Sequence, residues 1–152
     1  MAVVTPGTFT MAALTSEITN DPLGLGYSTL AQNSSAIADR MNTAPEPIAV
    51  GSQEQIFRNR TETYLVTSKI DRAEFVALAQ GVRDYLTVVF AQAFLQTGDA
   101  NLRTQLGGAF PVGPSRTAMT AAAQKDATRA EALWGDGFRV TAQQVYTAQG
   151  LL

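Results

Sequence analysis

The chain has 152 residues, of which 45% are hydrophobic and 16% are charged, and its formal net charge is -2. This length fits one domain of ordinary size, whereas the charged share is well below the ~25% typical of soluble domains. The chain contains neither histidine nor cysteine, so it lacks the commonest general base, a common metal ligand and the thiol nucleophile. We therefore expect a structural or interaction protein that is not an enzyme and that binds no cofactor or metal.

The low charge also bears on the expected partners. A surface with few charges lacks the repulsion that keeps monomers apart, which favours a protein that assembles, although an ordinary neutral surface is the alternative. The basic residues are scattered and form no run, so we expect no nucleic-acid partner. Apolar runs are too short for a membrane span, and the start of the chain lacks the features of a secretory signal. We expect synthesis in the cytoplasm and no membrane contact.

The N-terminal part predicts an extended arm followed by two short helices. Residues 1–9 form the arm because Pro6-Gly7 breaks regular structure. Thr10 can cap a first helix, and a second helix begins near Ser34, so that residues 10–42 form an N-terminal helical part. The Pro-rich residues 43–51 predict an extended connector.

Residues 52–152 are expected to form the main helical core. Between residues 53 and 69 the pattern is ambiguous, and we favour a helix before Arg60 and extended chain after it. Further along, apolar spacing and capping residues predict helices over Asp71 to Val82, Asp84 to Gln96, Ala100 to Leu106, Arg116 to Trp134, and from Thr141 onward. The predicted fold is mainly α: one compact multi-helix domain over residues 10–152, with at most a minor two-stranded element.

Carboxylates are the remaining candidates for chemistry. Asp71 and Glu74 have the spacing of a capping box, with Asp71 as the cap and Glu74 as its partner. The alternative is an acid pair of a hydrolase, which would need both carboxylates to converge in a pocket. We favour the capping interpretation.

Aromatic residues are more informative about binding. Tyr85, Phe90 and Phe94 have helical spacing and are expected in the core. Phe9 and Tyr27, together with Phe110, lie in predicted loops or in the arm, where local packing does not easily cover a ring. These last three are candidates for partner contacts, the alternative being that they cap the core.

The C-terminal segment carries a resemblance to a known group of proteins. Residues 127–135 (ATRAEALWG), followed by Val140-Thr141 and Val145, resemble the ending of small proteins encoded among the virion genes of tailed bacteriophages. Those proteins often close with a helix bearing the pattern K-x-T-R-A-E-x-L and then F or W, a glycine-rich turn and a short helix. Here Lys125 and Thr128 depart from that lysine spacing.

The segment 17–27 (EITNDPLGLGY) is similar to phage proteins of the same type, and the matches together cover about a third of the chain. The resemblance implies a virion component: a capsid cement or decoration protein, or a head–tail or tail accessory protein. Its partners would be other virion proteins and copies of itself. An assembly chaperone or regulator, absent from the mature particle, is the alternative.

The same pattern suggests a role for one arginine. In a long helix, Arg129 and Glu131 would lie on the outer side while Ala130 and Trp134 pack inward. Arg129 would then bind a carboxylate or carbonyls, either within its own fold, which we favour, or across an interface.

Overall fold

The computed structural model describes residues 3–43 and 54–151, and these residues are mainly helical, as predicted. They divide into two compact units where the sequence predicted one domain over residues 10–152. Unit 1 comprises Met1–Ile56 and Asp126–Leu152, and unit 2 comprises Phe57–Lys125. The chain enters unit 2 within strand β1 (Gln55–Phe57) and leaves it within strand β4 (Gln124–Asp126), which pair with each other. The predicted connector lies, apart from Thr43, outside the described residues.

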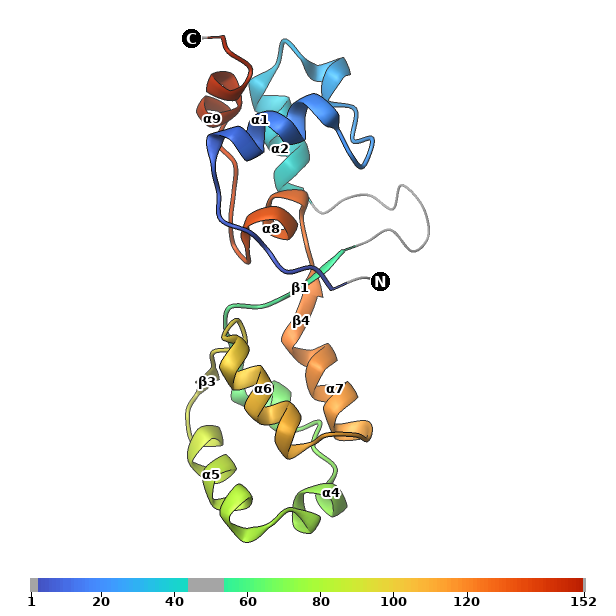
Figure 1. Ribbon diagram of the computed structural model, residues 1–152, viewed down its shortest axis with the longest axis vertical. Coiled ribbons are helices and arrows are strands. Elements are labelled where there is room, and N and C mark those ends of the chain that lie inside the picture. The colour runs from blue at the N-terminus through green and yellow to red at the C-terminus, as the bar shows by residue number, and fades with distance from the viewer. Residues whose placement is uncertain (1–2, 44–53, 152) are drawn as a thin grey trace. The chain divides into compact units, whose positions relative to one another are not determined.

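Unit 1 is built from short helices that enclose one core. Its elements are α1 (Met11–Asn20), the 3-10 helix η1 (Tyr27–Leu30), α2 (Ser34–Asn42), α8 (Arg129–Trp134) and α9 (Ala142–Ala148). Helix α9 packs against both α1 and α2, as Figure 1 shows. Leu14 of α1, Ile37 and Met41 of α2, and Val145 of α9 are completely buried together. Ile37 and Met41 are four residues apart, so they lie on one face of α2.

The described part of the N-terminal arm lies along its own unit. The Val4 amide donates to the Gln55 carbonyl (2.9 Å), and the Gly7 amide donates to the Leu133 carbonyl (2.8 Å). Thr10 then caps α1, because its hydroxyl accepts a hydrogen bond from the Ala13 amide at 3.1 Å. Residues 3–9 are therefore held by backbone bonds within unit 1.

Unit 2 contains five helices and one two-stranded sheet among the residues that the structure describes. They are β2 (Thr61–Glu62), α3 (Thr63–Thr67), α4 (Arg72–Ala77), α5 (Gln80–Phe90), β3 (Phe94–Leu95), α6 (Ala100–Ala109) and α7 (Pro114–Ala123). Strands β2 and β3 are antiparallel, with Thr61 opposite Leu95. The core joins Val66 of α3, Leu86 of α5, Leu106 of α6 and Met119 of α7.

Several predictions of secondary structure were wrong; the helix expected over Asp84 to Gln96, for example, ends at Phe90, and strand β3 follows. Strand β1 stands where a helix was expected before Arg60, and helix α3 stands where extended chain was expected after it. The predicted helix over 116–134 is interrupted by β4. Strands β1 and β4 are stabilised by pairing with each other, although they are far apart in sequence. Local spacing carries no information about such a partner.

The second half of that interrupted helix has its own start signal. The Thr128 hydroxyl accepts from the Glu131 amide at 3.2 Å, and the Glu131 carboxylate accepts from the Thr128 amide at 3.1 Å. This reciprocal capping box begins α8. The T-x-x-E spacing was therefore a readable helix start inside the predicted long helix.

The starts of helices α4 and α7 each supply a hydrogen-bond acceptor to the other. Asp71 caps α4 as predicted, with its carboxylate accepting from the Ala73 and Glu74 amides. Glu74, predicted to complete this box, instead accepts from the Ser115 amide at the start of α7 (3.1 Å). In return, the buried Ser115 hydroxyl accepts from the Asp71 amide at 2.7 Å. Each helix start is thus satisfied in part by the other helix.

Gly113 precedes α7 and makes this exchange possible. Its φ of +124° and ψ of 177° lie in a region that only glycine adopts readily. A Cβ at this position would also collide with the Glu74 carboxylate. Glycine at this position therefore leaves space for the Glu74 carboxylate at the start of α7.

We predict that Gly113→Ala lowers the free energy of unfolding by about 2 kcal/mol or more, because it adds backbone strain and displaces Glu74. Gly108→Ala is the matched control. Gly108 lies inside α6, and a Cβ at this position would meet no atom of another part of the chain within 4 Å. The control should be neutral or stabilise by up to about 1 kcal/mol. Urea denaturation measures both, and equal effects of the two variants would contradict the prediction.

Candidate functional site

A buried ionic network connects distant segments of unit 1. Arg129, only 9% exposed, donates from Nε and Nη2 to the two carboxylate oxygens of Glu17 at 2.7 and 2.8 Å. Its Nη1 also donates to Glu54 at 3.1 Å. The Tyr27 hydroxyl donates to the same Glu17 carboxylate at 3.4 Å. This bidentate geometry is the strong form of an arginine–carboxylate pair.

The network shifts the protonation of two of its members. Burial, with the nearby Glu17 charge, raises the pKa of the Tyr27 hydroxyl well above its ordinary value. Burial alone would lower the pKa of Arg129, but the Glu17 hydrogen bond and the charges of Glu17 and Glu54 outweigh it and raise that pKa. Tyr27 is therefore held neutral and Arg129 charged.

The placement of Arg129 and Glu131 on an outer face was wrong, because both are buried. Glu131 caps its own helix and accepts from the Gly137 amide at 3.0 Å. Arg129 binds carboxylates within its own fold, which is the alternative we favoured. Helix α8 has only six residues, so neighbouring segments of unit 1 surround it on several sides. An outer, solvent-exposed face for these two residues would require one long helix.

Two of the three aromatic contact candidates are corrected by the structure. Tyr27 is buried in unit 1 beside Glu17, and Phe110 is buried in the core of unit 2. Both rings come from short segments between α-helices that fold back over a core, so they take the alternative role of covering it. They are not available to a partner.

The third candidate, Phe9, belongs to an aromatic cluster. Its ring centroid lies 5.1 Å from that of Trp134 in an edge-on contact and 5.1 Å from that of Phe138 in a stacked contact. Trp134 and Phe138 are 5.3 Å apart, which closes the triangle. Phe9 is half-buried, so the cluster anchors the arm to unit 1.

Most of the exposed large apolar side chains among the described residues belong to unit 2. Five of them come from α3, α5 and β3, and we call them the α3–α5 surface: Tyr64, Leu65, Tyr85, Val88 and Phe94. Tyr64 is 74% exposed and Val88 is 70% exposed. The core prediction for Tyr85 and Phe94 was therefore wrong. Their helical spacing was real up to Phe90, but α5 ends there and its outer face is not covered within unit 2.

The elements of this surface are adjacent. The Thr63 amide at the start of α3 donates to the Ala93 carbonyl at 3.0 Å, next to β3. The Arg60 guanidinium lies 4.3 Å from the centre of the Phe94 ring and partly covers it. Tyr85 and Val88 lie about one turn apart on α5. The start of α3 therefore lies beside β3, and α5 carries two of the exposed side chains on one face.

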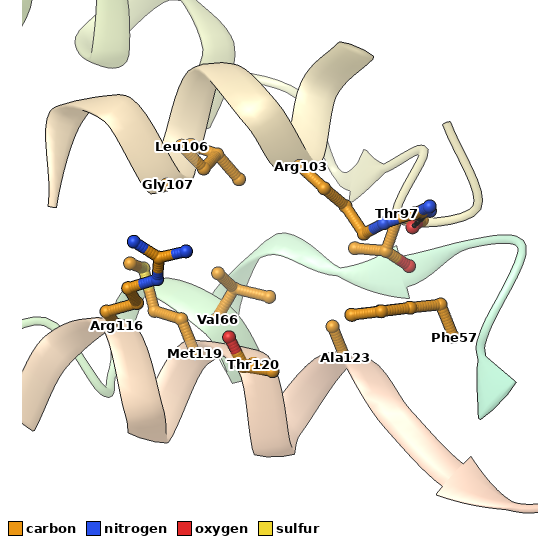
Figure 2. Close-up of a pocket in the computed structure, with 10 residues that line it drawn as sticks. All are labelled: Phe57, Val66, Thr97, Arg103, Leu106, Gly107, Arg116, Met119, Thr120 and Ala123. Carbon is orange, nitrogen blue, oxygen red and sulfur yellow. Dashed lines mark hydrogen bonds between the residues drawn. The ribbon is translucent and has the colours of Figure 1, made fainter. Parts of the chain in front are cut away.

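Unit 2 also contains a pocket of about 290 Å³. Figure 2 shows α6 on one side of it and α7 on the other, with the side chains of Arg103, Arg116, Met119 and Thr120 around the space between them. The remaining lining residues are Phe57, Val66, Thr97, Leu106, Gly107 and Ala123. The sequence alone does not predict this pocket. The space depends on how α6 and α7 pack, and neither segment defines it by itself.

Neither a metal site nor a membrane-spanning helix is found among the described residues. Within residues 3–43 and 54–151, no group of three or more acidic side chains is placed to hold a metal ion. In the same ranges, no helix is long and apolar enough to cross a bilayer. Comparison with models of protein families, with curated proteins and with solved structures found no match.

We predict that Arg129→Met destabilises the protein by about 3–5 kcal/mol, because the buried Glu17 carboxylate loses its only cationic partner among the described residues. Glu54→Gln is the matched control. It removes the more exposed acid of the same network and should cost less than about 1 kcal/mol. Urea denaturation of both variants tests this, and a loss below about 1 kcal/mol for Arg129→Met would contradict it.

The raised pKa of Tyr27 predicts a loss of stability in base. Above about pH 10 an unfolded tyrosine releases its proton while the folded one retains it, so the free energy of unfolding falls as pH rises. Tyr27→Phe should have a lower stability at neutral pH but a shallower decline above about pH 10. Denaturation at a series of pH values gives both slopes, and parallel slopes would contradict the assignment.

Proposed function

We propose that the chain is a non-enzymatic structural subunit of a tailed-phage-type particle. It would serve as a capsid cement or decoration protein, or as a head–tail or tail accessory protein. It would act through contacts with other virion proteins and with copies of itself. The observation that carries the proposal is the α3–α5 surface of unit 2, and the phage-like segments 127–135 and 17–27 suggest the kind of assembly.

The types of exposed side chain on unit 2 support a protein contact. Large apolar groups that gather on one side of a monomer are typical of interaction sites. Tyrosine is enriched among the residues that dominate binding energy, and Tyr64 and Tyr85 both lie on this surface. A chain with few charges adds little repulsion between neighbouring subunits. In a repeated assembly each contact can be weak, because many copies bind at once.

The described part of the arm is bound within unit 1. Residues 3–9 bond to Gln55 and Leu133, and Phe9 packs with Trp134 and Phe138. Removing residues 1–9 would therefore damage unit 1 itself. We therefore assign the assembly contact to unit 2, and the variants that test it leave the arm intact.

We predict that the double variant Tyr64→Ser, Val88→Ser remains folded but is incorporated into particles about ten-fold less than the natural chain, because two central apolar contacts are lost. Mass spectrometry of purified particles, from cells that express each variant during phage growth, measures incorporation. Circular dichroism checks the fold.

Val112→Ser is the matched control, since Val112 is 83% exposed on unit 2 but lies in the loop before α7. It should be incorporated normally. Equal incorporation of the double variant would overturn the role of the α3–α5 surface. Absence of the natural chain from particles, together with its recovery in cell extract as a monomer or dimer, would favour the assembly chaperone or regulator instead.

A further inference from the structure

The pocket of unit 2 combines an apolar floor with a cationic wall. Val66, Leu106 and Met119 line it, and all three belong to the core of unit 2. The cavity thus reaches the hydrophobic interior of the unit. Its volume of about 290 Å³ is near the lower end for ligand sites, so it suits a small ligand.

Both charged residues of the lining are arginines, although the chain as a whole has a formal net charge of -2. Within residues 3–43 and 54–151, neither Arg103 nor Arg116 forms an ion pair with a carboxylate. Guanidinium groups stay charged at any physiological pH. The pocket therefore presents positive charge that no described acid neutralises, and its wall favours an anion.

Arg103 is held in place by its own unit. Its Nη1 donates to the carbonyls of Thr97 and Gly98 at 2.8 and 2.7 Å, and its guanidinium lies 4.4 Å from the centre of the Phe57 ring. These contacts fix the charge at one end of the pocket. Arg103 is thus suited to contribute electrostatic attraction from a fixed position.

Arg116 has more donors available. Only its Nη1 is bonded within the described residues, to the Pro111 carbonyl at 2.7 Å. Its Nη2 lies beside Gly107, where a Cβ would approach it to 3.6 Å, so the glycine leaves room next to the guanidinium. In Figure 2 the Arg116 side chain extends from α7 towards α6, and the Thr120 hydroxyl also points to this space. A planar guanidinium edge is the preferred partner of a carboxylate.

We propose that this pocket binds a small carboxylic acid with a short apolar chain, with its carboxylate on Arg116 and its chain against Val66, Leu106 and Met119. Octanoate, a carboxylate with a short apolar chain, is the probe for a pocket of this size. This inference goes beyond the proposed assembly role and does not depend on it. The site is lined by residues of α6 and α7 and by Val66 of α3, and it shares no side chain with the α3–α5 surface.

The test measures binding to the full-length protein by calorimetry and by NMR. Octanoate should bind about ten-fold more tightly than 1-octanol, which lacks the charge, and more tightly than acetate, which lacks the apolar body. Octylamine, with the opposite charge, should not bind. The methyl resonances of Met119 and Leu106 should shift on titration with octanoate, since these residues form the floor.

Arg116→Gln should weaken octanoate binding about ten-fold, because a charge-assisted hydrogen bond is lost. Arg72→Gln is the matched control: it makes the same change of charge at an exposed site on α4 and should leave affinity within about two-fold. Thr120→Val, which keeps the side-chain shape, gives a second variant if Arg116→Gln does not fold, and should weaken binding a few-fold.

Three results would overturn the inference. The first is no binding of octanoate at millimolar concentration, and the second is equal affinity for octanoate and 1-octanol. The third is a set of shifted resonances that excludes Met119 and Leu106. None of these results bears on incorporation into particles, so the two proposals can fail separately.

Discussion

The buried guanidinium of Arg129 constrains the organisation of unit 1. A charge removed from water is tolerated only when carboxylates and hydrogen bonds replace the lost solvation. Glu17, 112 positions earlier in the chain, supplies both of its oxygens, and Glu54 supplies one more. The pair therefore joins helix α1 to helix α8, which are far apart in sequence. The core around Leu14, Ala130 and Val145 forms where these segments are brought together.

Unit 2 meets a related need at the starts of α4 and α7. The backbone amides at the start of a helix need acceptors, and a short helix has few of its own. Glu74 supplies one for α7, and Ser115 returns an acceptor to the Asp71 amide beside α4. This use of Asp71 and Glu74 explains both acids as structural, since their oxygens accept from backbone amides. The arginines of the pocket are different, because their charges have no such described counterpart.

The two surfaces of unit 2 suggest a division of roles. The α3–α5 surface exposes tyrosine and aliphatic groups that suit contact with a protein, whereas the pocket between α6 and α7 is sized and charged for a small amphiphilic anion. The helices that carry them meet in one core, which includes Leu86 of α5, Leu106 and Met119. A protein contact and a small-molecule site can therefore coexist on this unit without sharing a side chain.

Local sequence patterns determined the mainly helical class, the caps at Thr10 and Asp71, and the buried faces of α1, α2 and α9. These features depend on residues three or four positions apart, so their physical cause lies within the pattern itself. Tertiary structure alone decided that β4 interrupts the predicted long helix, that Arg129 is buried, and that the chain divides into two compact units. Each of these depends on a partner many residues away, such as Glu17 for Arg129. The pocket belongs to the same class, because a space between helices is a property of packing and not of any one segment.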